Sequence, residues 1–341
     1  MAPTAVYYHP RFLEHDTGHH PESPDRLVAC RRALLAGDLE LEWIEPDPAP
    51  LADIERVHAP AYVREVRDMA ADGGGHLDWD TAVSPASFEA ATLAAGAGVL
   101  AVDRAVADAG AAFLLVRPPG HHALRDRGMG FCLFNNIAVA AAHALAVGGV
   151  QRVLIVDWDV HHGNGTQDAF YDDDRVLFVS MHQHGHYPGT GDAAEVGSGR
   201  GAGYTVNVPL PAGAGDAAAE AVFDALVEPL ARAYRPQLVL VSAGFDSRRG
   251  DPLGGLAFSG PVYAWMASRL CSLARESAAG GPVCFLEGGY ETALLADSVV
   301  STVDGLQHEV PRPEAGMERA VEAAVTTTVR ALSPYWDGAL T

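Results

Sequence analysis

The chain has 341 residues, 48% of them hydrophobic, and a formal net charge of −21. This length is enough for one large α/β domain with a substantial core. The acidity argues against nucleic acid as a partner, because phosphate binding needs a basic surface. The same acidity is compatible with the attraction of cationic substrates.

Neither a membrane nor an oxidising compartment is expected. Residues 1–8 lack the basic start and long apolar run of a signal peptide, and the apolar runs elsewhere are too short to span a bilayer. The cysteines at positions 30, 132, 271 and 284 form no CxxC pair, which is typical of buried thiols in a reducing compartment. We therefore expect a cytoplasmic protein with no membrane partner.

Short apolar runs alternate with helical stretches along the chain. Runs rich in apolar and β-branched residues predict strands at 5–8, 113–116, 153–156, 176–180, 204–208, 238–242 and 283–287. Helices are predicted at 27–35, 61–71, 87–109, 136–146, 216–233, 261–278 and 317–331. This alternation predicts a three-layer α/β/α sandwich with a mainly parallel sheet, in a single domain spanning 1–341.

The stretch Asp157-Trp-Asp-Val-His-His-Gly-Asn-Gly165 begins where the predicted strand 153–156 ends. Alternate side chains of an extended chain share a face. Asp157, Asp159 and His161 should therefore project together at the strand's carboxyl end, where open parallel sheets place ligand sites. Their oxygen and nitrogen atoms suit zinc or a related divalent ion. The alternative is a polar turn that caps the next helix.

Four predicted strands end in side chains that can carry chemistry: His121 and His122; Asp157, Asp159 and His161; Asp246; and Tyr290. Asp159, His161 and Asp246 would make a three-ligand metal site with an open position. The histidine pair can supply a general base and acid, and Asp157 can fix a histidine tautomer. Tyr290, after a flexible Gly-Gly pair, can donate to an oxyanion. Together these groups predict a metal-assisted amide hydrolase.

The motifs that surround these residues belong to a recognisable set. They are His20-Pro-Glu-Ser-Pro-Asp-Arg26, Arg117-Pro-Pro-Gly-His-His122, Gly130-Phe-Cys-Leu-Phe-Asn135, Asp157 to Gly165, Ala243-Gly-Phe-Asp246 and Glu287-Gly-Gly-Tyr290. Over nearly its whole length, the sequence resembles the zinc-dependent histone deacetylase family. It looks closest to the class II branch and the bacterial deacetylase-like amidohydrolases, because Asn164 stands where class I members carry aspartate.

The resemblance implies an arginase–deacetylase fold and hydrolysis of an acyl amide, typically of acetyl-lysine. It implies the following roles: Asp159, His161 and Asp246 as zinc ligands; His122 as general base and then acid; His121 as its electrostatic partner, bonded to Asp157; Asn164 as the residue that orients His122; and Tyr290 as the donor to the acyl carbonyl. The amide of Asn164 should leave His122 less basic than a carboxylate would.

The resemblance also implies a substrate tunnel. Gly130 and Phe131 would line one wall. Tyr187 would form the opposite wall, where a second phenylalanine is usual, and this departure affects the acyl chain that the tunnel accepts. Leu253 would lie at the mouth and favours acyl-lysine peptides over acetylpolyamines, because polyamine-preferring relatives tend to carry an acidic group there. Arg26 would lie at the inner end, where acetate leaves.

Family members also hold potassium. The matching inner site would comprise Asp157, Asp159, His161, Ser180 and Met181, several of them through backbone oxygens. A second, peripheral site would comprise Phe170, Asp173, Val176 and Tyr204. Zinc is the expected catalytic ion, although iron(II) or cobalt could use the same three ligands.

Other functions remain open at this point. The first alternative is an acetylpolyamine or other small-amide amidohydrolase. The second, from another class, is a binding module that recognises acyl-lysine without hydrolysing it. A two-manganese site like that of arginase needs more carboxylates than the stretch around Asp159 offers. A second metal site at His182, His184 and His186 is a further possibility. The oligomeric state is not predicted.

Overall fold

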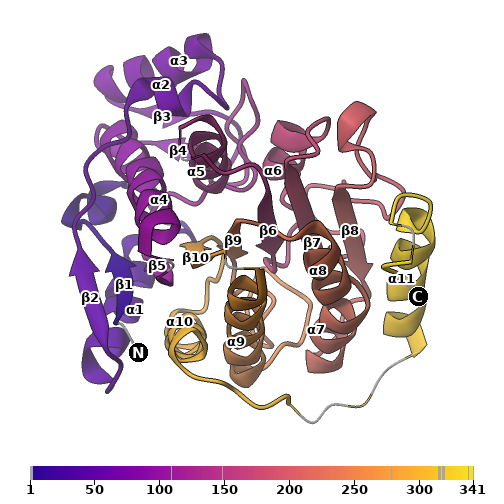
Figure 1. The fold of residues 1–341 in the computed structure, drawn as a ribbon. Helices are drawn as coiled ribbons and strands as arrows, with labels where there is room; N and C mark the ends of the chain where they lie inside the picture. Colours follow the sequence, from indigo (N-terminus) through magenta and orange to yellow (C-terminus); the bar gives the residue numbers. More distant parts are fainter. Residues whose placement is uncertain are drawn as a thin grey trace.

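Eight parallel strands form one sheet in the computed structural model (Figure 1), in the order β2-β1-β5-β10-β9-β6-β7-β8. The strands are β1 Thr4–Tyr7, β2 Leu41–Ile44, β5 Ala112–Leu114, β6 Val153–Asp157, β7 Val176–Gln183, β8 Thr205–Leu210, β9 Leu238–Ala243 and β10 Gly280–Leu286. A separate antiparallel hairpin joins β3 Gly75–His76 and β4 Ala82–Val83. The structure describes residues 3–108, 110–147, 149–277, 279–313, 316, 319–336 and 338–340.

Helices cover both faces of the sheet. The α-helices are α1 Pro24–Ala36, α2 Leu51–Ile54, α3 Pro60–Ala71, α4 Ser87–Asp108, α5 Asn136–Ala146, α6 Asn164–Phe170, α7 Asp216–Val222, α8 Glu228–Tyr234, α9 Gly260–Ser277, α10 Thr292–Gln307 and α11 Arg319–Leu332. In Figure 1, α4 and α5 lie to one side of the central strands, and α9 and α10 lie to the other. Because α4 and α9 both pack on β10, the predicted three-layer sandwich is confirmed.

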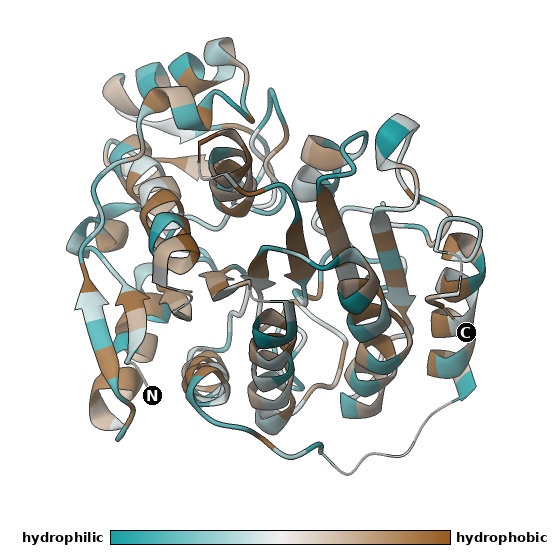
Figure 2. Ribbon diagram, viewed as in Figure 1, coloured by the Kyte–Doolittle hydropathy of each residue, from teal (hydrophilic) through white to brown (hydrophobic). Residues whose placement is uncertain are grey.

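The central strands form the core of the molecule. Every residue of β6, β9 and β10 is buried, and these strands are brown along most of their length in Figure 2. A parallel sheet covered on both faces requires continuous apolar runs, because each side chain meets a helix whichever way it points. This requirement explains why the apolar runs located the central strands correctly.

Helix α4 corrects one expectation about membranes. Its stretch Ser87–Ala107 has 21 residues and a mean hydropathy of 1.4, so it is long and apolar enough to cross a bilayer. The expectation that all apolar runs are too short was therefore wrong. Two thirds of this window is buried inside the protein, against α5 and β10. The apolar composition of α4 is thus explained by its place in the core.

The predicted helix at 216–233 contains an unpredicted π turn. The turn, η3, spans Phe223–Val227 between α7 and α8, and the Glu228 N–H donates to the Phe223 carbonyl five residues earlier. Pro229 follows directly and has no N–H to continue the usual pattern, which accounts for the change. Elsewhere the predicted helices agree to within a few residues, although positions 109, 278, 317 and 318 lie outside the described residues.

The strand order brings the four predicted strand ends together. Strands β5, β10, β9 and β6 are consecutive neighbours in the sheet, and all of them run parallel. The loops that carry the histidine pair, Tyr290, Asp246 and Asp159 therefore leave the sheet at one edge. This edge is where parallel α/β sheets bind their ligands.

Candidate active site

Two carboxylates and one imidazole converge beyond the ends of β6 and β9. Among the described residues, Asp159, His161 and Asp246 form a buried group whose ligand atoms lie within 4.8 Å of one another. His161 Nδ1 is 3.0 Å from Asp159 Oδ1 and 3.2 Å from Asp246 Oδ2. Burial and the charge of Asp159 raise the pKa of Asp246 to about 7. A divalent cation would relieve this repulsion, so the donor set fits a metal ion.

Backbone amides fix the orientation of both carboxylates. The Gly288 N–H donates to Asp159 Oδ2 at 2.9 Å, and the Val160 N–H donates to Asp246 Oδ1 at 2.9 Å. Asp246 Oδ2, which faces His161, is buried and accepts no hydrogen bond of good geometry. One carboxylate oxygen of Asp246 is therefore held in place, while the other is left for a cation.

The Gly-Gly pair before Tyr290 is tightly packed, in contrast to the expected flexible hinge. A Cβ atom on Gly288 would lie 2.0 Å from Asp246 Oδ2 and 2.7 Å from Asp159 Oδ2. Gly289 has φ +120°, a conformation that strains other residues. The glycines are needed here because the backbone passes directly beside the carboxylates.

The histidine pair lies beside this group, and each ring has a different partner. His121 Nδ1 is 3.0 Å from Asp157 Oδ2, and His122 Nδ1 is 2.7 Å from Asn164 Oδ1. Burial opposes protonation of His121, but the Asp159 and Asp157 carboxylates outweigh it and raise its pKa to about 10. Burial, with the positive charge of His121, lowers the pKa of His122 well below its usual value. The two ring centroids lie only 4.0 Å apart, yet His121 favours the protonated form and His122 the neutral form.

Aromatic rings surround the histidines. The Tyr187 ring is 5.1 Å from that of His122, and the Phe131 ring is 5.7 Å from that of Tyr290. Gly130 has φ +55°, and a Cβ atom there would lie 2.4 Å from His122 Cδ2. Burial raises the pKa of the half-buried Tyr290 well above its usual value, so its hydroxyl is protonated and able to donate. The residues predicted to line the tunnel are therefore close to the predicted catalytic groups.

Arg26 belongs to a buried ionic network that was not predicted from the sequence. Its guanidinium donates to Glu22 Oε1 at 3.1 Å, to the Gly289 carbonyl at 2.6 Å and to the Glu287 carbonyl. Arg117 donates to the same Glu22 carboxylate at 2.7 Å, and all three ionic side chains are fully buried. The network joins the loop before His121 to the loop that carries Tyr290.

Two further carboxylates hold the site loops in place, and this role was not predicted from the sequence. Glu287 Oε2 accepts the N–H groups of Gly120 and His121 at 2.7 and 3.2 Å. Asp251 Oδ2 accepts the Tyr290 N–H at 2.6 Å. Glu287 could have been recognised, because it is an ionisable residue that ends an apolar run, whereas no local pattern connects Asp251 to Tyr290.

The alternating histidines at the end of β7 and just after it, His182, His184 and His186, do not form a second metal site. His182 is buried and bonds to the Ser180 hydroxyl at 2.9 Å and the Gly191 carbonyl at 3.0 Å, whereas His184 is exposed. His186 stacks on His161 with ring centroids 4.9 Å apart, and its Nε2 donates to the Leu253 carbonyl at 2.8 Å. His186 therefore connects the predicted rim residue Leu253 to a predicted metal ligand.

Within each of the two predicted potassium sites, the structure brings several of the residues close together. Ser180 pairs with Asp157 across β6 and β7, and Met181 follows it. In the outer set, the Asp173 N–H donates to the Phe170 carbonyl at 3.1 Å and the Val176 N–H donates to the Asp173 carbonyl at 3.4 Å. Tyr204 directly precedes β8. Potassium binding remains a prediction for both sets.

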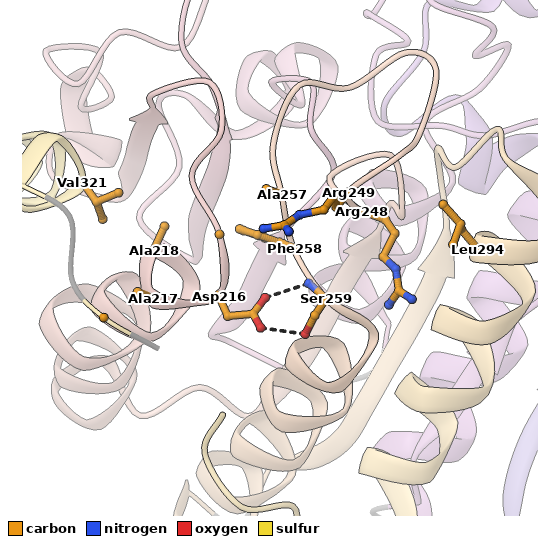
Figure 3. A pocket seen from close by; sticks show the side chains of 12 residues that line it. Asp216, Ala217, Ala218, Arg248, Arg249, Ala257, Phe258, Ser259, Leu294 and Val321 are labelled. Atoms are coloured by element: carbon orange, nitrogen blue, oxygen red, sulfur yellow. Dashed lines mark hydrogen bonds between the residues drawn. The ribbon is translucent and has the colours of Figure 1, made fainter. Parts of the chain in front are cut away.

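A separate cavity of about 450 Å³ lies beside the first turns of α7 and α9 (Figure 3). Asp216 faces it, but its carboxylate accepts both the N–H and the hydroxyl of Ser259, at 2.7 and 2.6 Å. Arg248 also lines it and is paired with Asp297 at 2.9 Å. The cavity contains none of the predicted metal ligands, so it is distinct from the candidate active site.

Comparison with known proteins identifies the family to which this geometry belongs. The family described as histone deacetylase domain matches residues 20–306. The chain belongs to the histone deacetylase family. It is a deacetylase or amidohydrolase of that family, with a buried Asp-His-Asp group that can hold the metal.

Individual relatives cover most of this chain. The histone deacetylase-like amidohydrolase of Pseudomonas aeruginosa is 38% identical over 301 residues, covering 86% of this chain and 79% of its own. The polyamine deacetylase HDAC10 of Homo sapiens is 40% identical over 357 residues, covering 98% of this chain and 53% of its own. The crystal structure of the HDA15 HD domain matches with a TM-score of 0.91 and 37% identity, covering 99% of this chain and 97% of that one.

Proposed function

We propose that this histone deacetylase homologue is a zinc-dependent hydrolase that removes acetyl or other acyl groups from lysine side chains. The observation that carries the proposal is the convergence of Asp159, His161 and Asp246 beside two differently charged histidines. A zinc ion held by these three residues would supply Lewis-acid chemistry, polarising the amide carbonyl and lowering the pKa of a water molecule.

The two histidines divide the proton transfers between them. His122, kept neutral by burial and by its positive neighbour His121, takes the proton from the attacking water as general base. It then delivers that proton to the departing lysine nitrogen. His121 stays protonated against Asp157, so it stabilises negative charge that develops nearby. Asn164 fixes the His122 ring through Nδ1, which leaves Nε2 to accept and return the proton.

Tyr290 and the aromatic rings position the acyl group. The protonated Tyr290 hydroxyl donates to the carbonyl oxygen as it gains negative charge. Arg26 lies 5.0 Å from the centroid of the Tyr290 ring and binds the carbonyls on either side of Gly288, which limits movement of the tyrosine. The lysine methylenes lie between Phe131 and Tyr187. We also propose that potassium occupies the Asp157 and Ser180 region and rigidifies the loop that carries the zinc ligands.

Acyl-lysine and acetylpolyamine are the two substrate classes to separate. The polyamine deacetylase relative supports the second class, whereas the apolar Leu253 near the site supports the first. The test is turnover of acyl-lysine peptides, from acetyl to longer chains, beside acetylspermidine. We expect kcat/KM to be higher on a peptide. Turnover of acetylspermidine alone would overturn the assignment of acyl-lysine peptides as the substrate class. The assignment of the protein as an amide hydrolase would stand.

A substitution at Asn164 tests the role of His122 as base. The variant Asn164→Asp places a carboxylate 2.7 Å from His122 Nδ1, and an adjacent negative charge raises an imidazole pKa by about 1–3 units. The base must be neutral to accept a proton. The acidic limb of the pH–activity profile should therefore move to higher pH. We expect the lower pKa of the kcat/KM profile to rise by at least about one unit.

Asn164→Ala is the matched control for this substitution. It removes the oriented hydrogen bond without adding charge, so it should lower kcat without moving the acidic limb upward. An unchanged pH profile in Asn164→Asp would contradict the assignment of His122 as the base.

A further inference from the structure

The turn between β3 and β4 carries an exposed tryptophan between two aspartates. Trp79 is 83% exposed, the highest value among the large hydrophobic side chains that the structure describes as exposed. Asp78 and Asp80 flank it and are half-buried. A large aromatic ring held in water has no role in the core, so its position needs another explanation.

The turn has an ordered backbone. Asp78 Oδ1 accepts the N–H groups of Asp80 and Thr81, at 3.1 and 2.7 Å. The Leu77 N–H donates to the Thr81 carbonyl at 2.9 Å. These bonds close the turn on itself and present Trp79 at its tip.

The turn is attached to the aromatic surroundings of the candidate site. The Phe131 N–H donates to Thr81 Oγ1 at 3.2 Å. Leu77 lies against the same loop, since its Cδ1 would be 2.6 Å from a Cβ atom on Gly128. Burial, with the charges of Asp80 and Asp78, raises the pKa of Tyr187 well above its usual value. Both aspartates are therefore within electrostatic range of Tyr187, and the turn lies beside both proposed walls.

One carboxylate oxygen in the turn has no partner. Asp80 Oδ1 is buried and makes no hydrogen bond, which is costly unless a ligand or water satisfies it. Burial and the neighbouring Asp78 carboxylate also raise the pKa of Asp80 to about 7. A cationic group bound beside Trp79 would cover the indole face and offset the repulsion between the two carboxylates. Lysine and arginine side chains have this chemistry.

We propose that Trp79, with Asp78 and Asp80, forms a contact for a lysine or arginine that neighbours the acyl-lysine in a peptide substrate. The inference rests on the proposed function, because it requires a peptide. Trp79 is two residues from Thr81, so the two Cα atoms are at most about 7 Å apart. The nearest neighbours of an extended peptide whose acyl-lysine passes Phe131 can reach that far. The contact would favour basic sequences and give no advantage to neutral ones.

The test compares peptides that differ only beside the acetyl-lysine. One peptide carries arginine on both sides and the matched peptide carries glutamine. We expect the wild-type protein to prefer the arginine peptide, through a lower KM. The variant Trp79→Ala should lower kcat/KM on that peptide by about two- to fivefold and leave the glutamine peptide unchanged. Trp79→Tyr, which keeps an aromatic face, should restore part of the preference.

Tyr335→Ala removes another exposed aromatic residue, 48% exposed, and should alter neither peptide. An equal loss on both peptides, or no loss on either, in Trp79→Ala would overturn the inference while the proposed function stands. Absence of turnover on every acyl-lysine peptide by the wild-type protein would overturn the proposed function, and the inference with it.

Discussion

Replacing His122 with alanine is expected to lower kcat on an acetyl-lysine peptide by about 10²- to 10⁴-fold. His122 is the buried imidazole that burial and the positive charge of His121 keep neutral. In the proposed mechanism it moves the proton from water to the departing amine. Asn164 holds the ring in place through Nδ1. Removing the ring leaves no neutral base at this position, because the adjacent His121 is protonated. Steady-state kinetics with one peptide measure the effect.

Two further measurements separate a catalytic loss from a structural one. The zinc content of His122→Ala should equal that of the wild-type protein, because His122 is not among the three metal ligands. The exposed His308, which pairs only with Asp304 in the described structure, supplies the control variant His308→Ala, with unchanged kcat. A His122→Ala protein that holds zinc and turns over peptide at the wild-type rate would refute the mechanism.

Replacing Glu22 with glutamine is expected to lower the free energy of unfolding by about 3–5 kcal/mol at pH 7. Glu22 is fully buried between Arg117 and Arg26, so the substitution leaves two buried guanidinium groups without their anion. Because this network connects the loops that carry His121 and Tyr290, catalytic activity should fall as well. Urea-induced unfolding measures the change in stability.

The pH dependence of this difference has a definite sign. Burial opposes ionisation of Glu22, but Arg117 and its other partners outweigh it and lower its pKa from 4.5 to about 2. A lowered pKa contributes stability above the unfolded value, and this stability is lost as the pH falls through 4.5 towards 2. The gap between wild type and Glu22→Gln should therefore be constant from pH 7 to pH 5 and shrink below about 4.5.

Glu14 provides the matched control for Glu22. It pairs with Arg11 at the surface, where both side chains are nearly half exposed. Such pairs contribute about 0–1 kcal/mol, so Glu14→Gln should leave the unfolding midpoint almost unchanged. Equal effects of the two substitutions would contradict the importance of the buried network.

The fold was predictable where burial dictates the residues. Strands β6, β9 and β10 are covered on both faces, so their sequences must be continuous apolar runs. Strand β2 at the sheet edge was missed, because its residues Leu41–Ile44 are at most half-buried and form no apolar run. Helix α10 was also missed, although Glu291 caps its first turn by accepting the Leu294 N–H at 2.6 Å.

The site was predictable to the extent that its residues stand at strand ends. Asp159, His161 and Asp246 were found in this way, and the structure brings them together. Residues that act through distant backbone contacts were not found. Asp251 binds the Tyr290 amide 39 positions later, and Glu22 binds Arg117 across 95 positions. Such partners are set by the packing of loops, which a single sequence does not show.

The metal dependence of turnover is the most direct test of the proposed zinc mechanism. Zinc content and peptide turnover should be measured together for the wild-type protein, for the chelated protein, after zinc is restored, and for Asp246→Asn. We expect about one zinc per chain, loss of turnover on chelation, recovery with zinc, and loss of both metal and activity in Asp246→Asn. Full turnover by metal-free protein, or by an Asp246→Asn protein without metal, would contradict this mechanism.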